Sequence, residues 1–99
     1  MVLNANTMFA QTRQQLRNSL SAASEALSFH LDSLNLRLRK ASWNVQLEEW
    51  QYARDEYDYV LRRASNNLAA LFYRAFVNEQ QKLYKYRMSH KGSSDIWSD

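Results

Sequence analysis

The residues of this chain best suited to chemistry are basic and aromatic side chains that alternate near its C-terminal end. Residues 82–91 read KLYKYRMSHK and hold four cations separated by two tyrosines: Lys82, Lys85, Arg87 and Lys91, with Tyr84 and Tyr86 between them. Cations that meet phosphates beside rings that stack on bases are a common way to bind single-stranded nucleic acid. The same cations also suit the last turns of a helix, where they offset its dipole, and Gly92 fits the position just past a helix end. A helix terminus is our preferred interpretation, and contact with nucleic acid or anionic lipid is the alternative.

A second basic group, Arg37, Arg39 and Lys40, would extend such a nucleic-acid interface. The chain as a whole carries 13 basic and 10 acidic residues, a formal charge of +3, and the two signs are interspersed. A dedicated nucleic-acid binder usually concentrates its basic residues in a denser stripe. We therefore rank nucleic-acid association second, and its signature would be binding that weakens steeply as salt rises.

Residues that could hold a metal or carry catalysis are sparse. The histidines are His30 and His90, and there is no cysteine. A helical metal site places ligands three or four residues apart, as in Glu-x-x-His, but Leu27 and Arg87 stand three residues before the two histidines. The one glycine leaves no Gly-rich phosphate loop, and no Ser-His-Asp arrangement is suggested. We predict no metal, no cofactor and no catalytic residue, hence a protein that is not an enzyme.

The elements that must position these side chains are helices, because the chain has one glycine and no proline, the residues on which sheets and hairpin turns depend. Apolar residues first recur at steps of three and four along the N-terminal half, at Leu16, Leu20, Ala23, Leu27, Leu31, Leu34, Leu38, Ala41 and Val45. This spacing predicts an amphipathic helix over about residues 6–40.

A second series with the same spacing runs through Trp50, Ala53, Tyr57, Val60, Ala64, Leu68, Leu71 and Ala75, and it predicts a helix over about residues 44–91. Asn66 and Asn67 would be polar flank residues inside this helix. The two helices would form an antiparallel hairpin over residues 1–92 that breaks between residues 39 and 45. The alternative is one near-continuous long helix, because no glycine or proline interrupts the chain there. Residues 93–99 would be a short tail.

Aromatic residues are concentrated in the second half of the chain, and they lie on more than one face of the second predicted helix. Tyr52 and Tyr59 form a stripe beside Trp50 and Tyr57, at a spacing of seven residues. One partner helix covers about one stripe, so a helix with two apolar faces needs two neighbours. In a two-helix chain the second neighbour must come from another chain. We therefore predict partner contacts, in a homo- or hetero-oligomer, at Tyr52, Tyr59, Phe72, Tyr73, Phe76 and, in the tail, Trp97.

The bulk properties favour a small subunit of something larger. At 99 residues the chain makes one domain, with a modest core. Its most apolar run, residues 68–77, is short and contains Arg74, so we expect no membrane span. Our leading prediction is a structural or adaptor subunit of a protein assembly that acts by helix packing. A virion component and a supernumerary subunit of an intracellular complex both fit, and the sequence specifies no compartment.

Residues 29–58 resemble the first helix pair of the Dps branch of the ferritin family. The resemblance lies in Ser42-Trp43-Asn44-Val45, where the family typically has His-Trp-Asn-Val, with an aromatic at Trp50 and an acid at Asp58. It implies a four-helix bundle built from two chains. Ser42 and Arg54 occupy the two positions where the family has iron-binding histidines, so only Asp58 matches a ligand. In outline the chain is also similar to the small Trp-x-Gly hairpins of type VII secretion, with Val45 in place of the glycine.

Overall fold

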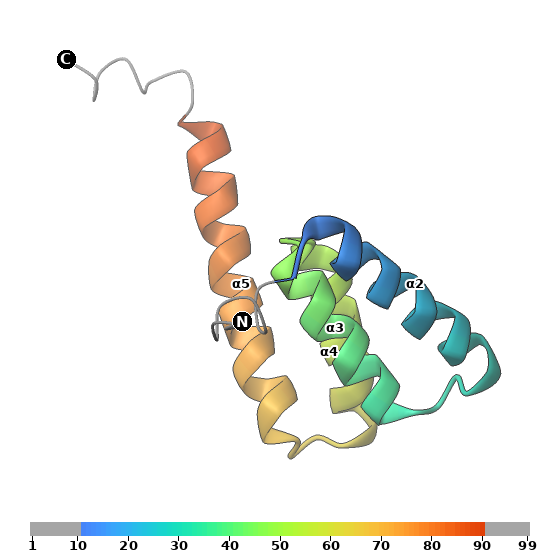
Figure 1. Ribbon diagram of the computed structural model, residues 1–99. Coiled ribbons are helices and arrows are strands. Elements are labelled where there is room, and N and C mark those ends of the chain that lie inside the picture. Colours follow the sequence, from blue (N-terminus) through green and yellow to red (C-terminus); the bar gives the residue numbers. More distant parts are fainter. Residues whose placement is uncertain (1–10, 91–99) are drawn as a thin grey trace, which may run out of the picture.

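The computed structural model describes residues 11–90, and this part of the chain contains four helices and no strand (Figure 1). They are α2 (Arg13–Phe29), α3 (Leu34–Gln46), α4 (Trp50–Arg63) and α5 (Leu68–Ser89). The all-α prediction is confirmed. Each helix packs against the next one along the chain, α2 on α3, α3 on α4 and α4 on α5. Over the described residues, no helix combines the length and apolar character needed to cross a membrane.

The prediction of two long helices in one hairpin is not confirmed, because each predicted helix is divided in two. The first division lies at residues 30–33 and the second at residues 64–67, while α3 continues through the expected break at 39–45. The chain instead turns at residues 47–49. The C-terminal tail, with Trp97, and Lys91 lie outside the described residues.

Side-chain caps explain the two unexpected divisions. Ser33 accepts the backbone N–H of Leu36 at 3.2 Å, and Asn67 accepts that of Ala70 at 2.9 Å. Such caps replace the backbone partners that the first N–H groups of a helix lack. Asn67 therefore begins a helix, and its prediction as a polar residue within one is wrong. The start of α2 is capped in the same way by Thr12, which exchanges hydrogen bonds with Gln15.

The turn between α3 and α4 uses a left-handed residue that is not a glycine. Glu48 has φ 59°, and backbone N–H groups on either side of it reach back to the end of α3. Leu47 donates to the carbonyl of Trp43 at 3.0 Å and Glu49 to that of Asn44 at 2.8 Å. These bonds close α3 although no glycine or proline stands at this turn.

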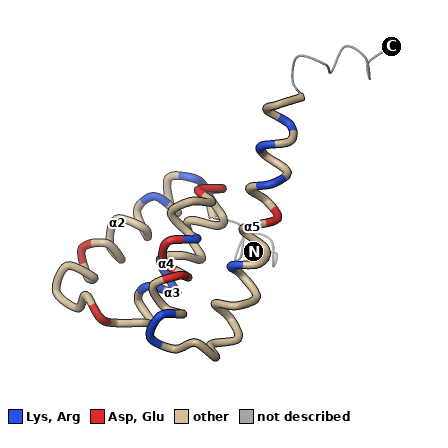
Figure 2. Tube along the Cα trace, turned by 180° about the vertical axis from the view of Figure 1, so that it is seen from behind, with Lys and Arg blue, Asp and Glu red and all other residues tan. Residues whose placement is uncertain are grey.

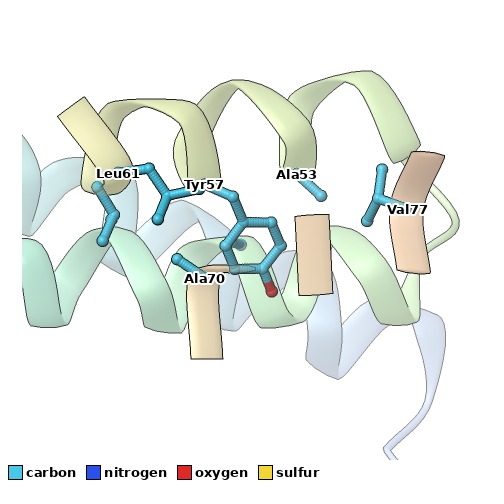
Figure 3. Close-up of a cluster of buried hydrophobic side chains, with 7 residues drawn as sticks. Ala53, Tyr57, Leu61, Ala70 and Val77 are labelled. Atoms are coloured by element: carbon cyan, nitrogen blue, oxygen red, sulfur yellow. The ribbon is translucent and has the colours of Figure 1, made fainter. Parts of the chain in front are cut away.

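The core lies mainly between α4 and its two neighbours (Figure 3). Its small residues let the helices approach closely around the Tyr57 ring, and the buried members are Ala41, Ala53, Tyr57, Val60, Leu61, Ala70 and Val77. The predicted apolar series is confirmed at Ala53, Tyr57 and Val60. It is wrong after the break at residues 64–67, because the new helix turns Leu68 and Leu71 outward, to 79% and 39% exposure.

Helix α5 is the longest of the four and extends past the start of α4 (Figure 1). Val77 is its last buried residue, and every residue from 82 to 90 is exposed. We call residues 82–89 the overhanging end of α5. The prediction of a helix over this basic segment is therefore confirmed. The segment is exposed to solvent, whereas in a helix bundle a neighbouring helix would pack against it.

Candidate functional site

Within residues 11–90, one side of α5 is apolar and uncovered, and we call it the outer face. It is made of Leu68, Phe72, Phe76 and Leu83, which are 79%, 65%, 39% and 47% exposed. Steps of four, four and seven residues place these side chains on one side of a helix. Ala70 and Val77, both fully buried, lie on the opposite side against α4. Contiguous exposed apolar surface of this kind is typical of a protein–protein contact.

Helix α4 holds α5 in place with aromatic contacts and an ion pair. The Trp50 and Phe76 rings meet edge to face at 6.1 Å between centroids, and Tyr57 stacks on Tyr73 at 6.0 Å. Arg74 Nη1 lies 3.2 Å from Oδ1 of Asp58. These contacts fix the rotation of α5 about its axis, and so decide which residues form the outer face.

Tyr57 is the most deeply buried aromatic residue within residues 11–90, at 2% exposure. Burial raises the pKa of its hydroxyl from 10.0 to about 12, and the neighbouring Tyr73 adds to the effect. The reason is that an ionised phenol loses hydration in the core. Tyr57 is therefore a neutral structural residue between α4 and α5.

The structure separates the residues predicted to bind partners. Phe72, Tyr73 and Phe76 are brought together on the exposed part of α5, with Phe72 and Tyr73 in edge contact at 5.1 Å. Tyr52 is 63% exposed but lies on α4. The remaining two do not join this group, since Tyr59 faces another part of the chain and Trp97 is outside the described residues.

Tyr59 has an intramolecular role that its spacing did not reveal. Its hydroxyl donates to the carbonyl oxygen of Leu31 at 3.1 Å. Its ring lies between two guanidinium groups, 3.6 Å from Arg37 and 3.8 Å from Arg63. Cations over a ring face are attracted to it. Tyr59 thus anchors the α2–α3 connection to α4.

The basic residues predicted as a nucleic-acid interface are also divided. Arg37 Nη1 and Lys40 Nζ pair with the two carboxylate oxygens of Glu56, at 2.9 and 2.6 Å, in a largely buried cluster. Their charge is thus balanced within the chain. Arg39 is exposed on α3. The carboxylate that balances them is itself buried, because Glu56 is only 8% exposed.

Figure 2 shows basic residues along the overhanging end of α5, where the sequence has Lys82, Lys85 and Arg87. Lys82 pairs with Glu79 one turn earlier at 3.3 Å, and both side chains are mostly exposed. Such surface pairs contribute little and leave the cation accessible. Arg54 of α4 reaches the same region, where its Nη1 lies 3.5 Å from Oε1 of Gln81.

Sequence reasoning missed Leu68 and Leu83 on the outer face, and Arg54 beside the overhanging end. The sequence did hold a signal for Leu68. Asn67 is a good N-cap residue, so a new helix could have been expected to begin at Leu68. No comparable signal existed for Arg54, since its neighbourhood with Gln81 depends on how α4 and α5 cross. Leu83 was missed because the residues around it were interpreted by their basic charge.

The residues that carry the resemblance to Dps lie at the end of α3 and in α4. Asn44 is buried and donates to Oε1 of Glu49 at 3.0 Å, while Asp58 is paired with Arg74. Within residues 11–90 no three metal-ligating side chains gather into a group that could hold a metal ion. The resemblance stays a prediction.

Comparison of the chain with protein-family models, curated proteins and solved structures gives no match. The fold therefore defines the class of this protein. Its described part is an all-α arrangement of sequentially packed helices, and the last of them, α5, has an exposed apolar face.

Proposed function

We propose that this chain is a non-enzymatic structural or adaptor subunit of a larger protein assembly, and that the outer face of α5 holds its neighbour. The observation that carries the proposal is the row Leu68, Phe72, Phe76 and Leu83, exposed along one side of a helix whose other side is packed in the core. Each of these side chains would stabilise the contact by roughly 1.5–3 kcal/mol if a partner buried it completely.

The sequential packing of the helices supports the same proposal. Within residues 11–90, each of α3 and α4 packs against two helices, whereas α5 packs mainly against α4. A further helix from another chain could continue the series on the outer face, as neighbouring units do in stacked helical proteins. A second copy and a different protein are both compatible with this arrangement, in a virion or in an intracellular complex.

The nucleic-acid alternative loses part of its predicted basis. Arg37 and Lys40 share the carboxylate of Glu56, and a phosphate that recruited them would leave this carboxylate buried without its partners. Of the basic residues predicted for that role, Arg39 and those of the overhanging end are left within residues 11–90.

Light scattering of the purified chain across a range of concentrations tests the proposal. We expect a defined oligomer that Phe72→Glu dissociates, because a carboxylate cannot be buried in an apolar contact without a partner. Phe72 is 65% exposed, so the variant should keep its helix content by circular dichroism. Asn35→Glu is the matched control, since Asn35 is exposed in the first turn of α3, where the helix dipole favours a carboxylate.

A second variant and a contradicting result complete the test. Tyr52→Glu asks whether α4 adds to the contact, as its spacing predicted. A monomer of 11.7 kDa at every concentration, with the same helix content as the Phe72→Glu variant, would contradict self-association through the outer face.

A further inference from the structure

A basic hollow lies between α4 and α5, on a different side of α5 from the outer face. Its volume is about 320 Å³, and it is lined by Arg54, Asn78, Gln81, Lys82 and Lys85. The lining therefore combines three cations and two amides without a carboxylate. Side chains of this kind suit an oxyanion such as a phosphate group.

The cations converge because two helices supply them. Arg54 comes from α4, and Lys82 and Lys85 come from one side of α5, three residues apart. Gln81 connects the helices, since it accepts from Arg54 at 3.5 Å and donates to Oε1 of Gln51 at 3.0 Å. The crossing of α4 and α5 thus holds like charges near one another.

The charge of this cluster is poorly balanced within residues 11–90. Lys82 has Glu79 as a partner, but that pair is exposed on both sides. Arg54 and Lys85 form no ion pair with any residue in the same part of the chain. Asn78, in the wall of the hollow, has a buried side-chain oxygen without a hydrogen-bond partner. A bound anion would offset the repulsion, and a donor on the same ligand would satisfy the amide.

An aromatic hollow of about 390 Å³ adjoins the basic one and shares Gln81 and Lys85 with it. Trp50 and Tyr84 line it, with Glu48 in its wall. Trp50 already contacts Phe76, whereas Tyr84 is 55% exposed and has no ring partner among the described residues. A base could stack on Tyr84, and Glu48 could accept a hydrogen bond from its amino group.

We propose that the junction of α4 and α5 binds single-stranded nucleic acid. One phosphate occupies the hollow lined by Arg54, Lys82 and Lys85, and the adjacent base stacks on Tyr84. Phosphate contacts supply affinity without sequence preference, and stacking tolerates every base. This site is independent of the outer face, so its failure and the failure of the proposed assembly role would be separate results.

Fluorescence anisotropy with a labelled oligothymidine of about 12 nucleotides tests the phosphate part. In the full chain, Arg54→Gln/Lys85→Gln should lower affinity about tenfold or more and reduce the slope of log affinity against log salt. Arg13→Gln/Arg62→Gln is the matched control, because it removes the same net charge from exposed positions on α2 and α4 that do not line the hollow. Equal losses in the two double variants, or no binding by the wild type at about 50 mM salt, would overturn the proposal.

The stacking part is tested with two tyrosines of equal exposure. Tyr84→Leu should weaken binding about five- to hundred-fold, while Tyr86→Leu, also 55% exposed but stacked on His90, should change it little. Vesicles of phosphatidylserine and inorganic phosphate are the remaining arms. Binding of vesicles in place of the oligonucleotide would assign the site to a membrane surface and overturn the proposal, whereas competition by inorganic phosphate for the oligonucleotide would support it.

Discussion

Arg37 and Glu56 lie 19 positions apart in the chain, and Nη1 of Arg37 is 2.9 Å from Oε1 of Glu56. The same guanidinium donates from Nε and Nη2 to the carbonyl oxygen of Leu31, at 3.1 and 2.8 Å, and its carbon lies 3.6 Å from the centre of the Tyr59 ring. One side chain therefore links the α2–α3 connection to both α3 and α4. Several of its contacts can be tested separately.

Glu56→Ala should destabilise the fold by about 3 kcal/mol, because it leaves Arg37 and Lys40 without their carboxylate in a largely buried position. Urea unfolding followed by circular dichroism measures the loss. Asp55→Ala, at the neighbouring exposed position, should change the free energy of unfolding by less than about 0.5 kcal/mol. Similar effects of the two substitutions would show that the cluster is not important for stability.

Arg37→Lys should lower the free energy of unfolding by about 1–2 kcal/mol, although it keeps the charge. The reason is that one ammonium cannot make three contacts at the same time, with Glu56, the Leu31 carbonyl and the Tyr59 ring. Hydrogen exchange gives a local readout, and the Ser33 amide should exchange faster in this variant. Arg39→Lys, on the exposed side of α3, serves as the control. An unchanged exchange rate in Arg37→Lys would argue against the anchoring role.

Glu48→Gly should stabilise the protein by up to about 1 kcal/mol, because residue 48 has φ 59° and a Cβ atom is unfavourable there. Thermal unfolding measures the change. Gln46→Gly, at the last residue of α3, should instead destabilise by up to about 1 kcal/mol. A loss of stability in Glu48→Gly would mean that the Glu48 carboxylate makes a contact worth more than the backbone strain.

Asn67→Ala should destabilise by about 1 kcal/mol, because it removes the side-chain acceptor for the Ala70 N–H at the start of α5. Asn66→Ala should be close to neutral, since the Asn66 side chain is exposed and caps no helix. Chemical denaturation of the two variants makes the comparison. The opposite order would place the helix boundary one residue earlier.

The stability of the fold should fall between about pH 10 and pH 12 through Tyr57. Its pKa is about 12 in the folded protein, above the ordinary value of 10.0, so the neutral form is favoured by folding. The contribution is therefore complete below pH 10 and is lost as the pH rises through about 12. Absorbance of ionised tyrosine should show a late-titrating group, and Tyr57→Phe should remove it. A Tyr57 that titrates near the ordinary value of 10.0 would contradict the structure.

Much of the local structure could be predicted from the sequence. The apolar spacing identifies Ala53, Tyr57 and Val60 as buried, and the absence of proline with a single glycine predicts helices. The breaks at Ser33 and Asn67 could also have been found, because both residues are good N-caps. They were missed because the apolar series continues across them at nearly helical spacing.

The site depended on longer-range geometry. Tyr59 and Phe72 are both aromatic residues in the second half of the chain, yet Tyr59 is enclosed by Arg37 and Arg63 whereas Phe72 faces outward. Nothing in their spacing separates them, because the difference arises from which neighbouring helix reaches each one. The same holds for Arg54, whose place near Lys85 depends on the crossing of α4 and α5.

The sequence by itself determined that the protein is all-α, where its strongest apolar stripes lie and that its C-terminal helix is rich in basic and aromatic residues. Only the tertiary structure decided that α5 turns an apolar row outward, that Glu56 neutralises Arg37 and Lys40, and that Arg54 joins the cations of α5. The physical reason is that periodicity reports which residues of one helix share a face. Burial and charge balance depend on which other helix covers that face, and at which rotation.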